Sequence, residues 1–504
     1  MVLEYTTTSE NEVVTPPLSG TVSCRINWGD GNSETITDRV SHTYSNPGVY
    51  TVSISGTCTY LSNSSKNCTK IKDWGNKWMG FIGSINAFSG CTGLTSIPSD
   101  VNQALSNIGQ MESMFSNCYS LASIPNNLFS YGNRTWNFSN MFSNCYSLKT
   151  IPNDLFKNCH EAENFTAIFS GCTGLTSMPS DLFENNNKAI YFTRTFYNCS
   201  GLTGSIPENL FANCPLCQYL DYTFAGCTSL TGSIPEKLFA NNNISYFNGA
   251  FAGCSGLTGL IPENLFKNCT SALNFESTFG GCSGLMGSIP EDLFKSCSNT
   301  NNINSVFAGC SGLTGSIPEK LFINNSKVAQ LSSIFSGCTS LTGSIPEDLF
   351  KSCSNVVRAS HIFYSCSGLT GSIPENLFAN CPLITEFNAT FSSCVRLTGE
   401  IPSGLFASCP EVTRFNGVFN GCTGLTSIGN NLFNNNKKMT VITTTFFGCV
   451  NLTGNTPTGL DGIELWDRAG QPGYPASVQG NRCFEGCTKL TNYAAIPRAW
   501  KQFN

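Results

Sequence analysis

The stretch Phe224–Phe239, FAGCTSLTGSIPEKLF, decides the fold because near-copies of it recur along most of the chain. Its opening Phe-x-x-Cys pair returns every 27 or 28 residues, apart from a final spacing of 38. A fixed period of about 20–50 residues is typical of a solenoid, in which each unit buries its apolar face against its neighbours. The pairs are Phe88/Cys91, Phe115/Cys118, Phe142/Cys145, Phe169/Cys172, Phe196/Cys199, Phe224/Cys227, Phe251/Cys254, Phe279/Cys282, Phe307/Cys310, Phe335/Cys338, Phe363/Cys366, Phe391/Cys394, Phe419/Cys422, Phe446/Cys449 and Phe484/Cys487.

Each unit divides into four local structures. We expect Phe224–Cys227 to form a short helical turn and Leu230–Ile234 to form a strand, with Leu and Ile facing inward at even spacing. Ser233-Ile-Pro-Glu236 has the Ser-x-x-Glu form of a capping box, which predicts a second helical turn there. The following Leu-Phe pair would then fill the core. An extended return segment, Ile244–Gly249, leads to the next Phe.

The composition argues against several classes of protein. Charged residues make up 12% of the 504 residues and the net charge is −5, so a basic face for nucleic acid is not expected. No apolar run reaches the roughly 18 residues of a membrane span, so no membrane insertion is expected. The N-terminus, MVLEYTTTSENEVVTPP, lacks the basic and apolar regions of a signal peptide. We expect either a removed leader or an unusual export route, such as release of a virion by lysis.

The 27 cysteines fall into two recurrent sets and five others. One set is the Phe-x-x-Cys position. The second follows Leu-Phe-x-x, where sister repeats instead have Asn186, Asn242, Asn325 and Asn436. Since Asn forms no disulfide, pairing between the sets is not required, and we predict reduced, buried cysteines that bond the backbone in preference to a disulfide array. The predicted structural ladder includes Cys227, Cys254, Cys282, Cys310, Cys338, Cys366, Cys394 and Cys422.

Two other cysteine pairs have spacings or positions relevant to a disulfide or a metal site. Cys24 and Cys58 are the one candidate disulfide, because both lie in or beside predicted strands of the same small domain. Cys214 and Cys217 form a lone C-x-x-C with no matching pair, which falls short of a zinc site. We therefore expect no metal and no cofactor.

Residues 1–58 contain strand-like segments, TVSCRINW and VYTVSISG, separated by turn signals. Trp28-Gly29-Asp30-Gly31, His42-Thr43-Tyr44 and Gly48-Val49-Tyr50-Thr51-Val52 follow the order and spacing of a PKD-type immunoglobulin-like domain, which this segment resembles. The resemblance implies a small all-β spacer, or a mediator of protein and glycan contact, without catalytic activity. His42 is a lone histidine, so we expect it to pack and not to bind metal.

The remaining chain is predicted to hold four segments: a junction with an N-terminal cap (59–87), the solenoid (88–449), an inserted loop (450–482), and the last repeat with a C-terminal cap (483–504). A solenoid needs its open end covered. We expect Trp74, Trp78, Phe81 and Ile82 to provide that cover at the N-terminal end.

The core Phe-x-x-Cys-x-x-Leu-Thr, as in Phe335–Thr342, resembles BspA-type leucine-rich repeats. LTGSIP, as in Leu202–Pro207, resembles the plant type, but the unit length and the Phe-x-x-Cys favour BspA. The resemblance implies a leucine-rich-repeat solenoid, with a strand and short helical turns in each coil, placed after the immunoglobulin-like domain. It also implies a bacterial, protist or phage-encoded surface protein that adheres to host proteins and cells.

No catalytic constellation is found. His42, His160 and His361 lie far apart and lack partner patterns, so we do not expect an enzyme. A glutamate follows the proline of many units and would form a file of carboxylates. Their identical surroundings favour capping over acid–base catalysis, which needs two different environments. These glutamates are Glu208, Glu236, Glu263, Glu291, Glu319, Glu347 and Glu375.

The units differ most in the return segment, so its outward residues are candidate ligand contacts, with unconstrained surface variation as the alternative. The candidates are Tyr222, Arg358, His361 and Arg414. In the inserted loop, Trp466 and Tyr474 are expected anchors that cover apolar surface, with binding as the alternative role.

Two functions remain. The first is a non-enzymatic adhesion protein, extracellular on a cell surface or phage virion, that contacts a host-surface protein or glycan through the solenoid face. It could also contact other virion proteins or copies of itself. The alternative is a structural subunit, such as a phage decoration or fibre protein or a self-assembling polymer.

Overall fold

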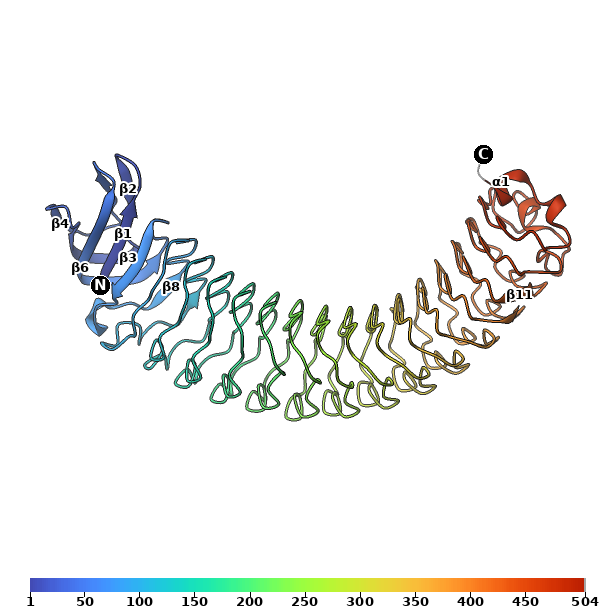
Figure 1. Cartoon of the computed structure of the whole chain (residues 1–504), viewed down its shortest axis with the longest axis horizontal. Helices are drawn as coiled ribbons and strands as arrows, with labels where there is room; N and C mark the ends of the chain where they lie inside the picture. Colours follow the sequence, from blue (N-terminus) through green and yellow to red (C-terminus); the bar gives the residue numbers. More distant parts are fainter. Residues whose placement is uncertain (503–504) are drawn as a thin grey trace. The chain divides into compact units, whose positions relative to one another are not determined.

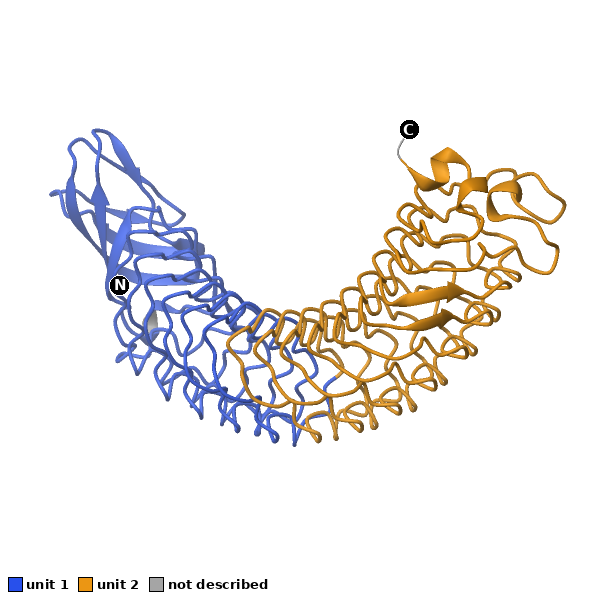
Figure 2. Cartoon of the chain, turned by 45° about the vertical axis from the view of Figure 1, so that its right-hand side comes forward, with its two compact units in different colours: residues 1–244 blue, residues 245–504 orange. Residues whose placement is uncertain are grey.

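The computed structural model describes residues 1–502, except for the side chain of Trp78. The chain divides into two compact units, residues 1–244 (unit 1) and residues 245–504 (unit 2), which Figure 2 distinguishes by colour. Unit 1 begins with a β domain and continues as stacked coils. Unit 2 consists of stacked coils followed by an irregular C-terminal segment (Figure 1).

Regular elements are concentrated in the first 112 residues. The strands are β1 (Val2–Thr7), β2 (Glu12–Val14), β3 (Leu18–Asn27), β4 (Ser33–Ile36), β5 (His42–Tyr44), β6 (Gly48–Ser62), β7 (Cys68–Asp73), β8 (Gly83–Ile85), β9 (Met111–Glu112), β10 (Gly399–Ile401) and β11 (Leu425–Ile428). The helical segments are η1 (Lys77–Met79), η2 (Leu465–Asp467), η3 (Tyr493–Ala495) and α1 (Arg498–Lys501). Across residues 1–502, no helix has the length and apolar character needed to cross a lipid bilayer.

The N-terminal domain is built on an antiparallel sheet in the order β4-β3-β6-β1-β7, with β2 and β5 paired separately. Burial in β3 alternates, since Val22, Cys24 and Ile26 are buried while Ser23 and Arg25 are exposed. This alternation is expected of a sheet with one face in the core. The all-β character is therefore observed, and the PKD-type immunoglobulin-like assignment stays a prediction.

The motif residues of this domain meet around Trp28, which is buried. The Trp28 and His42 rings stack with centroids 4.7 Å apart, and Tyr44 donates its hydroxyl hydrogen to the Trp28 carbonyl oxygen at 2.6 Å. Nε2 of His42 lies 2.7 Å from a carboxylate oxygen of Asp30. His42 is thus a packing residue held by one carboxylate.

The sheet extends beyond the expected boundary at residue 58. Strand β6 runs through that position to Ser62, and β7 pairs with β1, so the antiparallel part of the sheet extends to Asp73. The end of β6 also pairs in parallel with β8, and β8 pairs with β9. The first coils therefore continue the ladder that β6 begins, and β6 itself covers the open end of the stack in unit 1.

The predicted N-terminal cap is only partly observed. Trp74 and Phe81 are buried, and Trp74 packs edge-on against Phe88 and Phe115 at centroid distances of 6.1 and 6.2 Å. Ile82 is 49% exposed, so its expected capping role is wrong. Trp78, the fourth expected cap residue, lies outside the described side chains.

The candidate disulfide between Cys24 and Cys58 is not formed, because both cysteines are free. The Cys24 thiol donates to the Thr57 carbonyl oxygen at 3.1 Å. The Cys58 thiol lies 3.1 Å from the carbonyl oxygen of Ser19 and 3.0 Å from that of Tyr60. Each sulfur is directed at backbone of the sheet, so the prediction is wrong.

Coils are joined by backbone hydrogen bonds through the return segment and the repeat Phe. In unit 2, the N–H groups of Phe247, Gly249, Phe251 and Gly253 all donate to carbonyl oxygens one coil later, over 2.7–2.9 Å. The N–H groups of Ala250 and Ala252 donate back along the same coil, to the Phe247 carbonyl at 3.0 Å and to the Gly249 carbonyl at 2.9 Å. Alternate residues thus serve two networks, which satisfies the buried backbone without a regular strand.

The predicted strand of each unit lies in the wrong place. Pairing near the Leu-Thr-Gly-Ser-Ile segment is confined to β10 with β11 and a few isolated bridges, as at Gly287 with Leu313. The glycine of this segment has a positive φ, +75° at Gly315 and +78° at Gly343, which interrupts an extended chain. The parallel ladder runs instead through the return segments, as in the bridge between Arg358 and Glu386.

The predicted capping boxes are also wrong, because residues 88–449 contain no helix. The Pro-Glu-x-Leu segment forms a single turn, with the Leu238 N–H bonded to the Pro235 carbonyl at 3.2 Å. Glutamates of this row reach the next coil. Glu375 accepts from the Gly404 N–H at 3.0 Å, and Glu347 accepts from the Asn376 side-chain amide.

Columns of stacked phenylalanine rings fill the core of each unit. In unit 1 the repeat rings from Phe88 to Phe224 stack at centroid distances of 5.6–5.9 Å. In unit 2 the rings from Phe251 to Phe484 stack at 5.2–5.9 Å. Each aromatic pair contributes about 0.5–1.5 kcal/mol beyond its burial, so the repeat Phe is a principal source of stability.

Candidate functional site

The return segments place side chains in two outward rows. We call the first the pairing row, because its residues pair in parallel from coil to coil. It consists of Gln110, Asn137, Asn164, Tyr191 and Tyr219 in unit 1, and of Tyr246, Asn274, Asn302, Gln330, Arg358, Glu386, Arg414, Val441 and Gln479 in unit 2. The residue after each of them is buried in most coils, so the row faces outward, with Asn137 as a buried exception.

The second row lies two residues before each repeat Phe and has positive φ, so we call it the left-handed row. It includes Arg194 (φ 58°) and Tyr222 (φ 56°) in unit 1, and His361 (φ 58°) in unit 2. A left-handed conformation is unfavourable for such residues. At Arg194 and His361 it is supported by a hydrogen bond from the residue's own N–H to the next coil, to the Asp221 carbonyl at 2.8 Å and to the Asn388 carbonyl at 2.7 Å.

The four predicted contact residues separate between these rows and between the units. Tyr222 lies in the left-handed row of unit 1 and is half-buried. Arg358 and Arg414 lie in the pairing row of unit 2, and His361 lies in its left-handed row; these three are exposed. The structure therefore groups Tyr222 with a different set of neighbours from the other three.

In unit 1, Tyr222 belongs to a cluster that we call the tyrosine patch. Its members are Tyr191, Arg194, Tyr197, Tyr219 and Tyr222, all on two successive coils. The Tyr191 and Tyr219 rings stack at 5.0 Å. The Arg194 guanidinium carbon lies 5.6 Å from the Tyr197 ring centre and 5.5 Å from that of Tyr222. Sequence analysis found only Tyr222, although aligning the units at their 28-residue spacing places Arg194 beside it.

In unit 2, the pairing row contains a charged stretch, Arg358, Glu386 and Arg414, which we call the charged row. Nε of Arg358 lies 3.4 Å from a carboxylate oxygen of Glu386. The ion pairs of the described residues do not include Arg414. The row thus presents one neutralised arginine and one whose charge is not offset by a salt bridge.

His361 lies beside the charged row, with its ring edge-on to Tyr364 at 5.8 Å. Tyr364 is 40% exposed. Partial burial lowers the pKa of His361, which favours the neutral imidazole near pH 7. These two rings add an aromatic element next to Arg358, one coil before Glu386.

The ladder cysteines are buried, and their thiols bond backbone carbonyl oxygens one coil earlier. The pairs, over 2.9–3.1 Å, are Cys227–Phe196, Cys282–Phe251, Cys310–Phe279, Cys338–Phe307, Cys366–Phe335, Cys394–Phe363 and Cys422–Phe391. Cys254 is buried as well. Burial raises the pKa of Cys227, Cys282 and Cys338 to about 12. These thiols are therefore protonated structural groups with little nucleophilic character at neutral pH.

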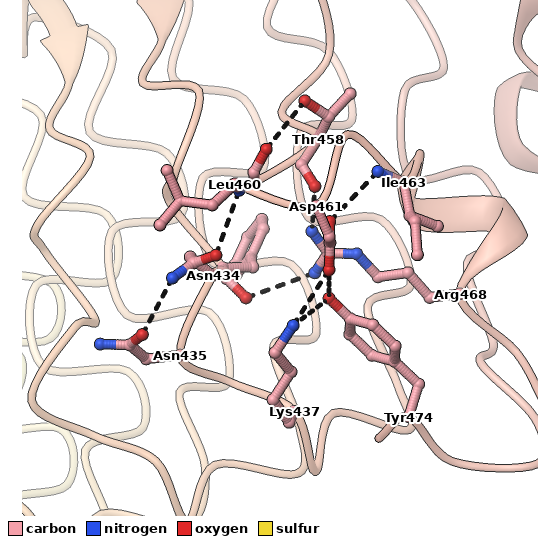
Figure 3. Close-up of polar contacts among 11 residues, drawn as sticks. Asn434, Asn435, Lys437, Thr458, Leu460, Asp461, Ile463, Arg468 and Tyr474 are labelled. Atoms are coloured by element: carbon pink, nitrogen blue, oxygen red, sulfur yellow. Dashed lines mark hydrogen bonds and ion pairs between the residues drawn. The ribbon is translucent and has the colours of Figure 1, made fainter. Parts of the chain in front are cut away.

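A structured loop packs against the last coils of unit 2. Asp461 accepts hydrogen bonds from Lys437 at 3.0 Å and from the Tyr474 hydroxyl, as Figure 3 shows. Arg468 is fully buried and donates to the carbonyl oxygens of Phe433 (3.3 Å) and Thr458 (2.7 Å). Tyr474 is thus an anchor, as expected, and Arg468 is an anchor that sequence analysis missed.

The charged and polar groups of this loop bond one another and hold the loop against the last coils. Partial burial acts to raise the pKa of Asp461, but hydrogen bonds from Tyr474 and Lys437 hold it below its usual range. Burial lowers the pKa of Arg468. An open recess of about 700 Å³ lies alongside, bordered by Lys437, Asp461 and Leu460. Leu460 is 79% exposed. The polar groups of the loop are largely satisfied by one another, which is the expected pattern for an anchor.

In the part of the chain that the structure describes, no three His, Cys, Asp or Glu side chains meet in an arrangement that could hold a metal ion. The outward rows offer hydroxyl, amide, aromatic and guanidinium groups. Such groups suit non-covalent recognition of a partner.

The matches to known family models lie in the repeat region of the chain. Residues 81–217 match the model of the BspA type leucine-rich repeat region, which holds six copies. In unit 2, residues 245–377 and 273–404 match a second model, "Mycoplasma protein of unknown function, DUF285". The resemblance read from Phe-x-x-Cys is thus confirmed for the BspA-type repeats of unit 1. No curated protein sequence matches the chain.

Solved leucine-rich-repeat structures show similarity at low identity. A plant peptide hormone receptor, RGFR1 in complex with RGF2, is 17% identical, with 79% of this chain and 73% of that chain covered and a TM-score of 0.39. A leucine rich cell surface protein from Faecalibacterium prausnitzii is 18% identical, with 60% and 82% covered and a TM-score of 0.27. The Arabidopsis receptor kinase HAESA, with the peptide hormone IDA and the co-receptor SERK1, is 15% identical, with 80% and 72% covered and a TM-score of 0.24. TM-scores this low carry no inference about function.

Proposed function

We propose that this protein is a non-enzymatic binding protein, exposed at a cell or phage-virion surface, that contacts a host protein or glycan through its outward rows. The observation that carries the proposal is the tyrosine patch. Four tyrosines and one arginine lie on two successive coils, and the equivalents of Arg194 and Tyr222 in the left-handed row elsewhere are mostly Ser, Thr, Asn or Gly. Tyrosine and arginine are the residues most enriched where binding energy concentrates.

The scaffold supports this role. Backbone N–H groups at or next to the outward residues are engaged with the next coil or the same coil. The Arg194 N–H donates to the Asp221 carbonyl, and the N–H groups of Thr195 and Thr223 donate to the Phe192 and Leu220 carbonyls. The outward side chains are therefore held at fixed spacing by a rigid ladder. A pre-organised surface loses less conformational entropy on binding, and this favours affinity.

The chemistry of the outward rows also favours recognition over catalysis. The buried thiols are protonated and inaccessible, since burial raises the pKa of Cys227 to about 12. His361 has an aromatic neighbour, Tyr364, and within residues 1–502 no nucleophilic side chain is hydrogen-bonded to its ring. The surface placement rests on the BspA-type repeats, whose resemblance implies surface display.

A binding screen of the full chain tests the proposal. Purified protein would be passed over immobilised extracellular-matrix proteins, intact host cells and a glycan array, with a double variant, Tyr222→Ala with Arg194→Ala, as the matched control. We expect at least one target to bind the native chain and to lose most binding to the variant. No binding to any target, together with self-assembly of the purified chain, would contradict the proposal and favour the structural subunit.

A further inference from the structure

The electrostatic character of the tyrosine patch limits the class of partner that it could bind. The Arg194 side chain is exposed, and its guanidinium carbon lies near the rings of both Tyr197 and Tyr222, at 5.6 and 5.5 Å from their centres. The Tyr197 and Tyr222 rings are edge-on to each other at 6.4 Å. Contact with an aromatic ring fixes a guanidinium without neutralising it. The ion pairs of residues 1–502 do not include Arg194.

The neighbouring tyrosines add groups of the same polarity. The Tyr191 and Tyr219 rings stack with an interplanar angle of 19°, so their faces are turned toward each other. The pair therefore presents ring edges and hydroxyl groups to an approaching molecule. Ring edges are electropositive, and a phenol O–H is a hydrogen-bond donor. The patch as a whole offers one cation and several donors.

We propose that the tyrosine patch binds an acidic segment of a protein, with a carboxylate of that segment bound by the Arg194 guanidinium. Arginine binds a carboxylate through two parallel hydrogen bonds, a geometry that its planar fork provides and lysine does not. The proposal rests on the proposed function and specifies its partner. It concerns unit 1 alone.

Two observations favour a peptide over a sugar. A sugar that stacks on an aromatic side chain needs a free ring face, and the stacking of Tyr191 on Tyr219 covers one face of each ring. Tyrosine and arginine together are also the usual centre of a protein–protein contact, where a rim of polar groups excludes water. The hydroxyl and amide groups of the surrounding coils, such as Thr193 and Asn164, can form that rim.

The patch tolerates the substitutions needed to test it. In other coils alanine occupies the left-handed row at Ala167 (φ 53°) and Ala389 (φ 51°), so Arg194→Ala is compatible with the backbone. Arg134 is an exposed arginine of unit 1 outside both rows. Arg134→Ala is therefore a control with the same change in net charge.

The test uses the full chain and an array of synthetic peptides with graded glutamate content, alongside sulfated and sialylated oligosaccharides. We expect affinity to rise with glutamate content and to fall with salt, because an exposed ion pair is screened. Arg194→Ala should weaken binding about tenfold or more, Arg194→Lys should rescue only part of it, and Arg134→Ala should change it less than about twofold.

Each other outcome contradicts the proposal in a distinguishable way. Equal losses in Arg194→Ala and Arg134→Ala would mean a general charge effect. Binding of acidic oligosaccharides with no response to glutamate-rich peptides would assign the patch to glycans, and the proposed function would still stand. Peptide binding that is indifferent to Arg194 would overturn the site alone. Absence of every ligand in both screens would overturn the proposed function as well.

Discussion

The side-chain amide of Asn325 donates a hydrogen bond to the carbonyl oxygen of Cys297, one coil earlier, over 2.8 Å. It makes a second bond to the carbonyl oxygen of Phe294 at 3.3 Å. In other coils a cysteine stands at this position, and the Cys381 thiol bonds the Cys353 carbonyl at 3.4 Å. Asn and Cys are therefore interchangeable here because both donate to the same backbone acceptor.

This equivalence predicts that one substitution of Asn325 has little effect on stability and that another, with a side chain of similar volume, is strongly destabilising. Asn325→Cys should change the free energy of unfolding by less than about 1 kcal/mol, because a thiol replaces one donor and removes the buried Oδ1, which has no partner among the described residues. Asn325→Asp should lower it by about 3 kcal/mol or more at neutral pH, because a buried carboxylate would face two carbonyl oxygens.

Urea unfolding followed by circular dichroism measures both variants. The Asp variant should recover stability as the pH falls, because protonation restores a neutral group that can donate. Asn324→Asp is the control, since Asn324 is exposed and water replaces its bond to the Lys295 carbonyl. Equal losses at the two positions would contradict the ladder role of Asn325.

All 27 cysteines are free and buried, which predicts masked thiols. A thiolate is the reactive form, and burial keeps these groups protonated. The native protein should therefore react slowly with Ellman's reagent at mildly alkaline pH. After denaturation without reductant, all of its thiols should react. If fewer than half of the thiols were free after denaturation, the structure's reduced ladder would be wrong.

The same burial predicts loss of stability in alkali. Burial raises the pKa of Cys227 and Cys338 from 9.0 to about 12, so the folded state holds protons that the unfolded state releases. The contribution is complete below pH 9 and is lost as the pH rises toward 12. Urea midpoints should fall through this window. Cys338→Ala should have a shallower pH dependence than the native chain despite its lower stability, and an unchanged slope would exclude the thiols as the cause.

The period and the buried columns could be predicted from the sequence because a fixed spacing directly encodes which residues lie one coil apart. The strand position could not. Leu-Thr-Gly-Ser-Ile alternates like a strand, yet Gly315 and its equivalents adopt positive φ, which ends an extended chain. The recurrent glycine in the middle of the segment was the available signal.

Only part of the candidate site could be predicted, because its residues are related through neighbouring coils. Tyr222 was found from variation between units, but Arg194 was missed because its importance comes from its neighbour one coil on. Aligning the units by their spacing would have paired the two. Arg468 had no such signal, since residues 450–482 do not follow the repeat and nothing in the sequence sets their register.

Arg468 should hold the C-terminal loop in place. It is fully buried, and its guanidinium bonds the Phe433 and Thr458 carbonyl oxygens. Arg468→Ala should leave these acceptors short of donors at a cost of about 1–3 kcal/mol, which favours local opening over global unfolding. Limited proteolysis with chymotrypsin should then cut near Trp466 and Tyr474 faster than in the native chain. Arg498→Ala, at an exposed arginine of α1, should leave the cleavage rate unchanged, and equal cleavage in the two variants would contradict the anchoring role.

The charged row predicts that its two arginines contribute unequally to the binding of a partner. Arg358 shares its charge with Glu386 at 3.4 Å, whereas the ion pairs of the described residues do not include Arg414. If a partner contacts this row, Arg414→Ala should weaken binding about tenfold and Arg358→Ala by much less, since the free guanidinium is the stronger recognition group.

Biolayer interferometry with a partner from the surface screen measures both, and unchanged melting temperatures would show that the variants are folded. Arg396→Ala, at an exposed arginine outside the row, controls for net charge. Equal effects of Arg414→Ala and Arg396→Ala would place the contact elsewhere, because only a specific contact distinguishes two exposed arginines of the same unit.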